Sequence, residues 1–93
     1  MDTNQQMDRM LCEQALELYR KVEAAVERGS GVYAKEKLTE LRLFLKSQTQ
    51  HSAFRGADSY LPRAKSNPYE WKPDLAQSRG YVESYLRELE RKP

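Results

Sequence analysis

The sequence contains one histidine and one cysteine, the two residue types most often used for catalysis or metal binding. His51 lies in the polar run 47–52. General acid–base catalysis needs a proton donor that a second group holds in a pocket, and this run offers no obvious pocket. Cys12 lies beside a stripe of apolar residues, where a thiol most often acts as a small buried hydrophobe. We therefore expect a solvated His51, a buried Cys12 and no enzymatic activity.

Metal and cofactor sites need residue patterns that this chain lacks. A single cysteine and a single histidine rule out the usual zinc patterns. The run Gly29-Ser30-Gly31 follows no predicted strand and precedes no Lys-Ser/Thr pair, so it is not a phosphate-binding loop. We expect no metal and no cofactor. Because one cysteine cannot form an internal disulfide, the sequence also favours a reducing, cytoplasmic setting.

The segment 60–73 is the strongest candidate for a binding site, because it joins basic side chains to aromatic ones and contains three prolines. Trp, Tyr and Arg contribute most of the binding energy at protein interfaces. We expect a protein partner to contact Arg63, Lys65, Tyr69 and Trp71. Two alternatives stay open: Tyr69 and Trp71 could instead pack on the core, or the segment could bind RNA. The RNA-binding residues would then be Arg55, Arg63, Lys65, Tyr69 and Lys72.

Composition and charge set the class of protein. The chain has 93 residues, which is the size of one domain, and 39% of them are hydrophobic. No apolar run is long enough to span a bilayer. The formal net charge is +2, which is not typical of a strong nucleic-acid binder. The excess lies in residues 51–80, which hold five basic and three acidic side chains.

Two helices are predicted in the first half of the chain. Residues 3–28 carry the apolar stripe Leu11, Ala15, Leu18, Val22 and Ala25, which Cys12, Tyr19 and Val26 widen by one position. The glycines at 29 and 31 end this helix. Residues 32–47 carry the stripe Ala34, Leu38, Leu41 and Leu45. The short connection predicts an antiparallel helical hairpin, in which each stripe covers the other.

The two helices of this hairpin differ in length. About 26 residues span roughly 39 Å, whereas about 16 residues span roughly 24 Å. Roughly 15 Å of the first helix therefore extends beyond the second. We expect Met7, Met10, Leu11 and Ala15 to be covered by the C-terminal segment or by another chain. Because exposed apolar helix surface usually marks an interface, Met7, Met10 and Leu11 are the predicted self-association surface of a homo-oligomer.

The second half of the chain predicts two more helices. Residues 53–61 form a short helix with Ser52 as its N-cap and with Phe54, Ala57 and Leu61 on its apolar side. Residues 62–73 form a proline-rich loop, and a last helix covers 74–91, in which Gly80 favours a kink or a late start. The predicted fold is a single all-α domain over residues 1–93.

Residues 55–91 resemble the small bacterial and phage proteins related to ribosome modulation factor. The shared elements are a short helix with Arg55-Gly56-Ala57, then Asn67-Pro68-Tyr69, and then a helix with two aromatic residues, here Tyr81 and Tyr85. That family has a Trp-x-x-Gly-Trp pattern where this chain has Tyr81-Val82-Glu83-Ser84-Tyr85. The resemblance implies binding to ribosomal RNA that silences ribosomes.

These patterns predict a non-catalytic regulatory or adaptor protein of bacterial or phage type. It would act in the cytoplasm by binding another protein, and self-association as a homodimer is compatible with the sequence. The alternative function is that of an RNA- or ribosome-binding modulator, which would use the segment 55–72.

Overall fold

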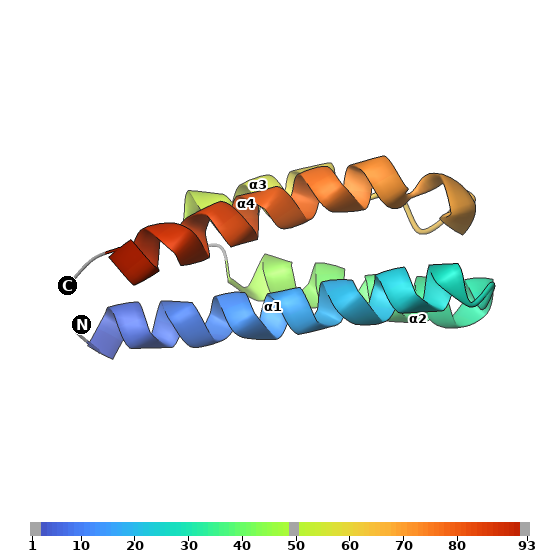
Figure 1. Cartoon of the computed structure of the whole chain (residues 1–93). Coiled ribbons are helices and arrows are strands. Elements are labelled where there is room, and N and C mark those ends of the chain that lie inside the picture. The colour runs from blue at the N-terminus through green and yellow to red at the C-terminus, as the bar shows by residue number, and fades with distance from the viewer. Residues whose placement is uncertain (1–2, 49–50, 92–93) are drawn as a thin grey trace.

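The computed structural model describes residues 3–48 and 51–91 (Figure 1). It contains the helices α1 (Thr3–Glu27), α2 (Gly31–Ser47), α3 (Ser52–Tyr60) and α4 (Lys72–Arg91), and the 3₁₀ turn η1 (Pro68–Glu70). The described part of the chain has no strand, so the predicted all-α fold is confirmed. Each helix begins and ends within two residues of its predicted bounds. α4 begins at Lys72 and is continuous through Gly80, so the late start that this glycine favoured is not observed.

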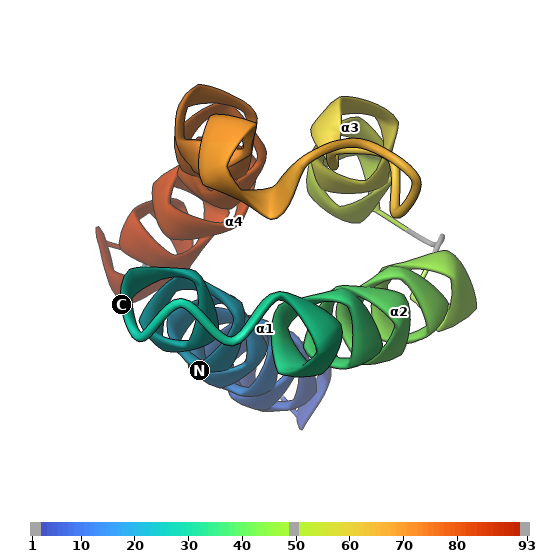
Figure 2. The same cartoon turned by 90° about the vertical axis from the view of Figure 1, so that its right-hand side faces the viewer.

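The four helices form two layers (Figure 2). α1 and α2 form one layer, and α3 and α4 form the other, with α4 lying along α1 and α3 along α2. Each helix runs antiparallel to the next one in the chain, so the start of α1 and the end of α4 lie at the same end of the molecule (Figure 1). The shape is elongated, with extents of 42 × 21 × 18 Å.

The turn between α1 and α2 has the hydrogen bonds of a Schellman motif. The Ser30 N–H donates to the Ala25 carbonyl over 2.9 Å, and the Gly29 N–H donates to the Val26 carbonyl over 3.0 Å. Gly29 has a φ of 75°, a conformation that glycine adopts without steric cost. The predicted end of the first helix at these glycines is therefore confirmed.

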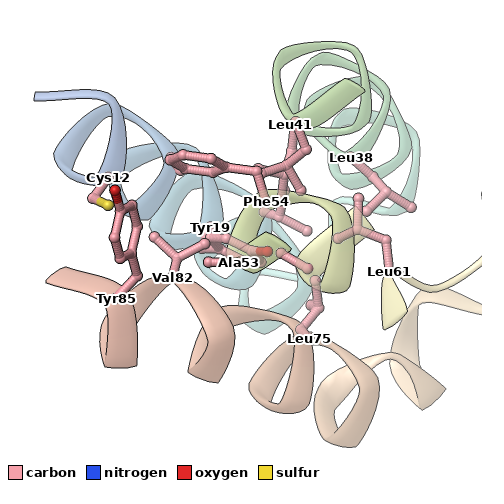
Figure 3. Close-up of a cluster of buried hydrophobic side chains, with 14 of the residues drawn as sticks. Cys12, Tyr19, Leu38, Leu41, Ala53, Phe54, Leu61, Leu75, Val82 and Tyr85 are labelled. Atoms are coloured by element: carbon pink, nitrogen blue, oxygen red, sulfur yellow. The ribbon is translucent and has the colours of Figure 1, made fainter. Parts of the chain in front are cut away.

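The core is built from the apolar faces of all four helices (Figure 3). The predicted stripe of α2 and the predicted apolar side of α3 are buried. On α1, Cys12 and Tyr19 are fully buried, whereas Leu11 and Leu18 are only partly buried. The buried face of α1 is rotated in this way because the helix packs against α4 as well as α2.

α4 contacts the predicted overhang of α1 and covers part of it. The Tyr85 hydroxyl donates to Asp8 Oδ2 over 2.5 Å. One turn after Asp8, Cys12 is buried, and Ala15 is buried as well. Met7 and Met10 are not covered, and they remain 56% and 58% exposed. Of the predicted overhang, Ala15 is therefore fully buried and Leu11 partly buried, whereas the two methionines are open.

A buried polar chain joins three of the helices. Ser78 Oγ on α4 donates to the Ala57 carbonyl over 2.6 Å, in the last turn of α3, where carbonyls lack partners within the helix. Tyr19 Oη on α1 lies 2.5 Å from Ser78 Oγ. Because Ser78 gives its hydrogen to Ala57, the Tyr19 hydroxyl is the donor of this second bond.

Candidate partner-binding surface

The proline-rich loop 61–71 connects α3 to α4 at the end of the molecule opposite the start of α1 and the end of α4 (Figure 1). It is attached to α2 at two points. Arg42 Nη2 donates to the Pro62 carbonyl over 2.7 Å. Further along the loop, Pro68 is buried beside Gly31, and a Cβ at Gly31 would lie 3.8 Å from Pro68 Cγ. The loop therefore follows α2 from near its middle to its first residue.

Trp71 holds the loop from the inside. Its side chain is 1% exposed, and its Nε1 donates to Ser66 Oγ over 2.8 Å. Ser66 in turn donates from its backbone N–H and from its hydroxyl to the Arg63 carbonyl, over 3.0 and 2.6 Å. Trp71 therefore packs on the core, which was one of the two alternatives to partner binding. A side chain buried to this degree is not available as the partner contact that we expected.

Tyr69 has the opposite environment. Asn67 caps the 3₁₀ turn, because its side-chain oxygen accepts from the Tyr69 N–H over 3.0 Å. The turn directs the Tyr69 ring over the α1–α2 connection, where its hydroxyl lies 3.4 Å from the position of a Cβ at Gly29. The ring is 61% exposed. Tyr69 is therefore a well-positioned aromatic side chain that remains accessible.

Arg63 and Lys65 are both exposed on the same loop. Within residues 3–48 and 51–91, no ion pair joins either of them to an acidic side chain. We call Arg63, Lys65 and Tyr69 the loop surface. It presents two unpaired cations and one aromatic ring on a backbone whose shape is fixed by internal hydrogen bonds, a combination suited to binding.

The residues of the RNA alternative are not all brought together. Arg63, Lys65 and Tyr69 share the loop, but Arg55 lies on the first turn of α3. Lys72 begins α4 on the side of α1, where it borders a small hollow with Glu23 and Glu27. The set is therefore divided among three elements.

A groove that the sequence did not predict lies between α3 and α4. It has a volume of about 650 Å³ and opens to solvent, and its lining comes from the start of α3 and the outer face of α4. The lining residues are His51, Ser52, Ala53, Gln77, Gly80, Tyr81, Ser84, Tyr85 and Glu88. Periodicity could have placed Gly80, Ser84 and Glu88 on one face of a helix, but no pattern within the sequence pairs them with His51.

His51 is not the solvated linker residue that we expected. Its ring stacks on Tyr85 with the centroids 3.7 Å apart, and its Nδ1 accepts from the Ala53 N–H over 3.0 Å. His51, rather than Ser52, is therefore the N-cap of α3. The prediction of Ser52 as the cap was wrong because an imidazole nitrogen can accept the same backbone hydrogen that a serine hydroxyl would.

Gly56 lies behind Tyr81 in the wall of the groove, and Gly80 lines the groove itself. A Cβ at Gly56 would lie 2.8 Å from Cδ1 of Tyr81, so the missing side chain lets the Tyr81 ring rest on α3. There the ring stacks on Tyr60 with the centroids 5.4 Å apart. A Cβ at Gly80 would meet nothing within 4 Å. The wall of the groove therefore depends on Gly56, whereas Gly80 has no packing role within the described chain.

The environment of Cys12 is unsuited to nucleophilic chemistry. Burial, with the nearby carboxylates of Asp8 and Glu13, raises the pKa of its thiol to about 12. The reactive thiolate is therefore scarce at neutral pH. In the part of the chain that the structure describes, no three His, Cys, Asp or Glu side chains gather in a way that could hold a metal ion.

The function of this chain has to be inferred from its own sequence and geometry. Among the described residues, no helix has the length and apolar character needed to cross a membrane. No protein-family model, curated protein or solved structure matches this chain.

Proposed function

We propose that this chain is a small, non-catalytic binding protein that acts as a regulator or adaptor by docking another protein on the loop surface of Arg63, Lys65 and Tyr69. The observation that carries the proposal is the contrast within one loop. Trp71 is buried and hydrogen-bonded to Ser66, and Tyr69, two residues earlier, is 61% exposed.

This contrast favours binding for an energetic reason. Ordering a loop when a partner arrives costs free energy, and a loop that is already ordered avoids much of that cost. Tyr and Arg are among the residues that contribute most at interfaces when a partner desolvates them. Trp71 then serves binding indirectly, by fixing the loop that presents Tyr69 and Arg63.

RNA binding is the second candidate function, and the resemblance of residues 55–91 to ribosome modulation factor favours it. The geometry supports it less than protein docking. RNA-binding surfaces commonly stack bases on several aromatic rings, whereas the loop exposes Tyr69 and buries Trp71. Arg55 and Lys72 lie on other elements than the loop.

Self-association through α1 is a further part of the proposal. Met7 and Met10 lie on the overhang of α1, where α4 leaves them more than half exposed, and Leu11 beside them is half-buried. A homodimer would cover these side chains. Analytical ultracentrifugation of the wild type and of a Met7→Gln/Met10→Gln variant tests this, because a concentration-dependent dimer that the variant loses is the expected result.

Docking on the loop surface can be tested by photo-crosslinking in cells of the source organism. A photoreactive phenylalanine analogue replaces Tyr69 in one sample and Ala76, an exposed residue of α4, in a control. We expect discrete adducts with protein from position 69 and none from position 76. Adducts with RNA from position 69 would support the second candidate, and equal adducts from both positions would contradict docking on this surface.

A further inference from the structure

The two attachments of the loop to α2 place its basic side chains along one edge of that helix. Pro62 is attached at Arg42, and Pro68 lies beside Gly31. From Gly31 to Arg42 there are eleven residue steps, which span about 16 Å along α2. Arg63 and Lys65 lie between the two prolines in the sequence, so they follow this edge.

Lys35 of α2 lies on the same edge. Residues separated by three or four positions share one face of a helix, and the series 31, 35, 39, 42 joins Gly31 to Arg42 in such steps. Lys35 is exposed and stands between the two points where the loop is attached. From the two attachment points and the helical period we infer that four basic residues from two segments lie along this edge, and we call them the basic strip: Lys35, Arg42, Arg63 and Lys65.

Acidic side chains are fewer than basic ones along this edge: Glu36 follows Lys35 on α2 and Glu70 follows Tyr69 on the loop, and both are exposed. Residues 61–69 of the loop contain no Asp or Glu. On α2, Glu40 pairs with Lys37 over 2.7 Å, and that ammonium also lies 5.2 Å from the centre of the Tyr33 ring. Residues 33, 37 and 40 form the opposite edge of α2. Within the described ranges, no ion pair neutralises Lys35, Arg63 or Lys65.

We propose that the partner presents an acidic segment, which binds along the basic strip and ends at Tyr69. This inference rests on the proposed function and specifies the chemistry of the partner. Charge complementarity is its basis, because an unpaired row of like charges binds and orients a surface of opposite charge. An extended peptide of about five residues covers about 16 Å, which is the length of the strip.

The inference is tested by fluorescence anisotropy with three labelled probes, which are a short Glu-rich peptide, the same peptide with Gln in place of Glu, and a short single-stranded RNA. The test variant is Lys35→Glu/Lys65→Glu. The matched control is Lys21→Glu/Arg91→Glu, which makes the same change in net charge at exposed residues of α1 and α4. Circular dichroism checks that both variants keep the helical content of the wild type.

We expect the Glu-rich peptide to bind at least about tenfold more tightly than the Gln peptide at low salt. The strip variant should lose about tenfold in affinity for it, and the control less than about threefold. The inference is overturned if the two peptides bind equally, if neither binds, if the two variants lose affinity equally, or if RNA binds more tightly than the Glu-rich peptide. If any of these results is found together with discrete protein crosslinks from position 69, the partner is not acidic, but docking on the loop surface still holds.

Discussion

Trp71 Nε1 donates to Ser66 Oγ over 2.8 Å, and this bond links the buried end of the loop to the segment that carries Arg63 and Lys65. Ser66 also fixes the backbone at Arg63, because its hydroxyl donates to the Arg63 carbonyl over 2.6 Å. One serine thus connects the core to the proposed binding surface.

Replacing Ser66 should weaken binding through the shape of the loop. Ser66→Ala leaves Trp71 Nε1 and the Arg63 carbonyl without this hydroxyl, so we expect a loss of about 1 kcal/mol in the free energy of unfolding. Amide hydrogen exchange in residues 63–69 should become faster. The matched variant is Tyr69→Ala, which should change stability by less than about 0.5 kcal/mol because the ring is mostly exposed. A loop that exchanges as slowly in Ser66→Ala as in the wild type would contradict the role of Ser66.

Ser78 should be among the residues most sensitive to substitution. Ser78→Ala removes the partner of the buried Tyr19 hydroxyl and of the Ala57 carbonyl together. Each buried polar group left unpaired costs about 1–3 kcal/mol, so we expect a loss of about 2–6 kcal/mol in the free energy of unfolding, measured by chemical denaturation. A double-mutant cycle with Tyr19→Phe should give a coupling energy of about 1 kcal/mol, and additive losses would show that the two side chains act independently.

Replacing Gly80 or Gly56 with alanine should change the stability of the protein in opposite directions. Gly80→Ala places its Cβ in open space within α4, so we expect a gain of about 1 kcal/mol from helix propensity. Gly56→Ala places its Cβ 2.8 Å from Tyr81 Cδ1, and the ring must then leave its stack on Tyr60. We expect that variant to be less stable than the wild type in thermal unfolding. A stabilising Gly56→Ala would contradict the contact between α3 and Tyr81.

Cys12 should make the protein sensitive to alkaline pH. Burial raises the pKa of its thiol to about 12, and burial raises the pKa values of Tyr19 and Tyr85 as well. Because a thiol in the unfolded chain loses its proton near pH 9, the unfolded state binds fewer protons than the folded state above that pH. Stability should therefore be complete below pH 9 and fall by about 1.4 kcal/mol per pH unit from Cys12 as the pH rises toward 12.

Cys12→Ala provides the control for this prediction. Between about pH 8.5 and 9.5, the slope of the unfolding free energy against pH should become shallower in the variant. Tyr19 and Tyr85 contribute little in this window, because tyrosine in the unfolded chain titrates near pH 10. Alkylation by iodoacetamide at pH 8 should also be slow in the folded wild type and fast in denaturant. Equal slopes in the two proteins would show that Cys12 does not titrate as a buried thiol.

The local parts of the fold could be predicted from the sequence because the physics that sets them is local. The 3.6-residue period placed the stripe of α2, and Gly29 marked the end of α1. The features that could not be predicted depend on contacts between residues that are far apart in the sequence. The stack of His51 on Tyr85 and the rotation of the buried face of α1 toward Cys12 and Tyr19 both require knowing that α4 returns along α1.

The candidate site shows the same division. Arg63, Lys65 and Tyr69 could be named from residue type, and the structure leaves all three exposed. Trp71 belongs to the same residue class but is buried, since composition does not distinguish a core aromatic from an interface aromatic. Lys35 gave no signal in the sequence, because its place in the proposed basic strip depends on the attachment of the loop to α2 at Arg42 and Gly31.

Crosslinking from position 69, with position 76 as its control, tests docking on the loop surface most directly. The account predicts discrete protein adducts from position 69 that decrease when Ser66→Ala is added, because that substitution releases the loop. An absence of protein adducts from position 69, or adducts that position 76 forms equally well, would contradict it.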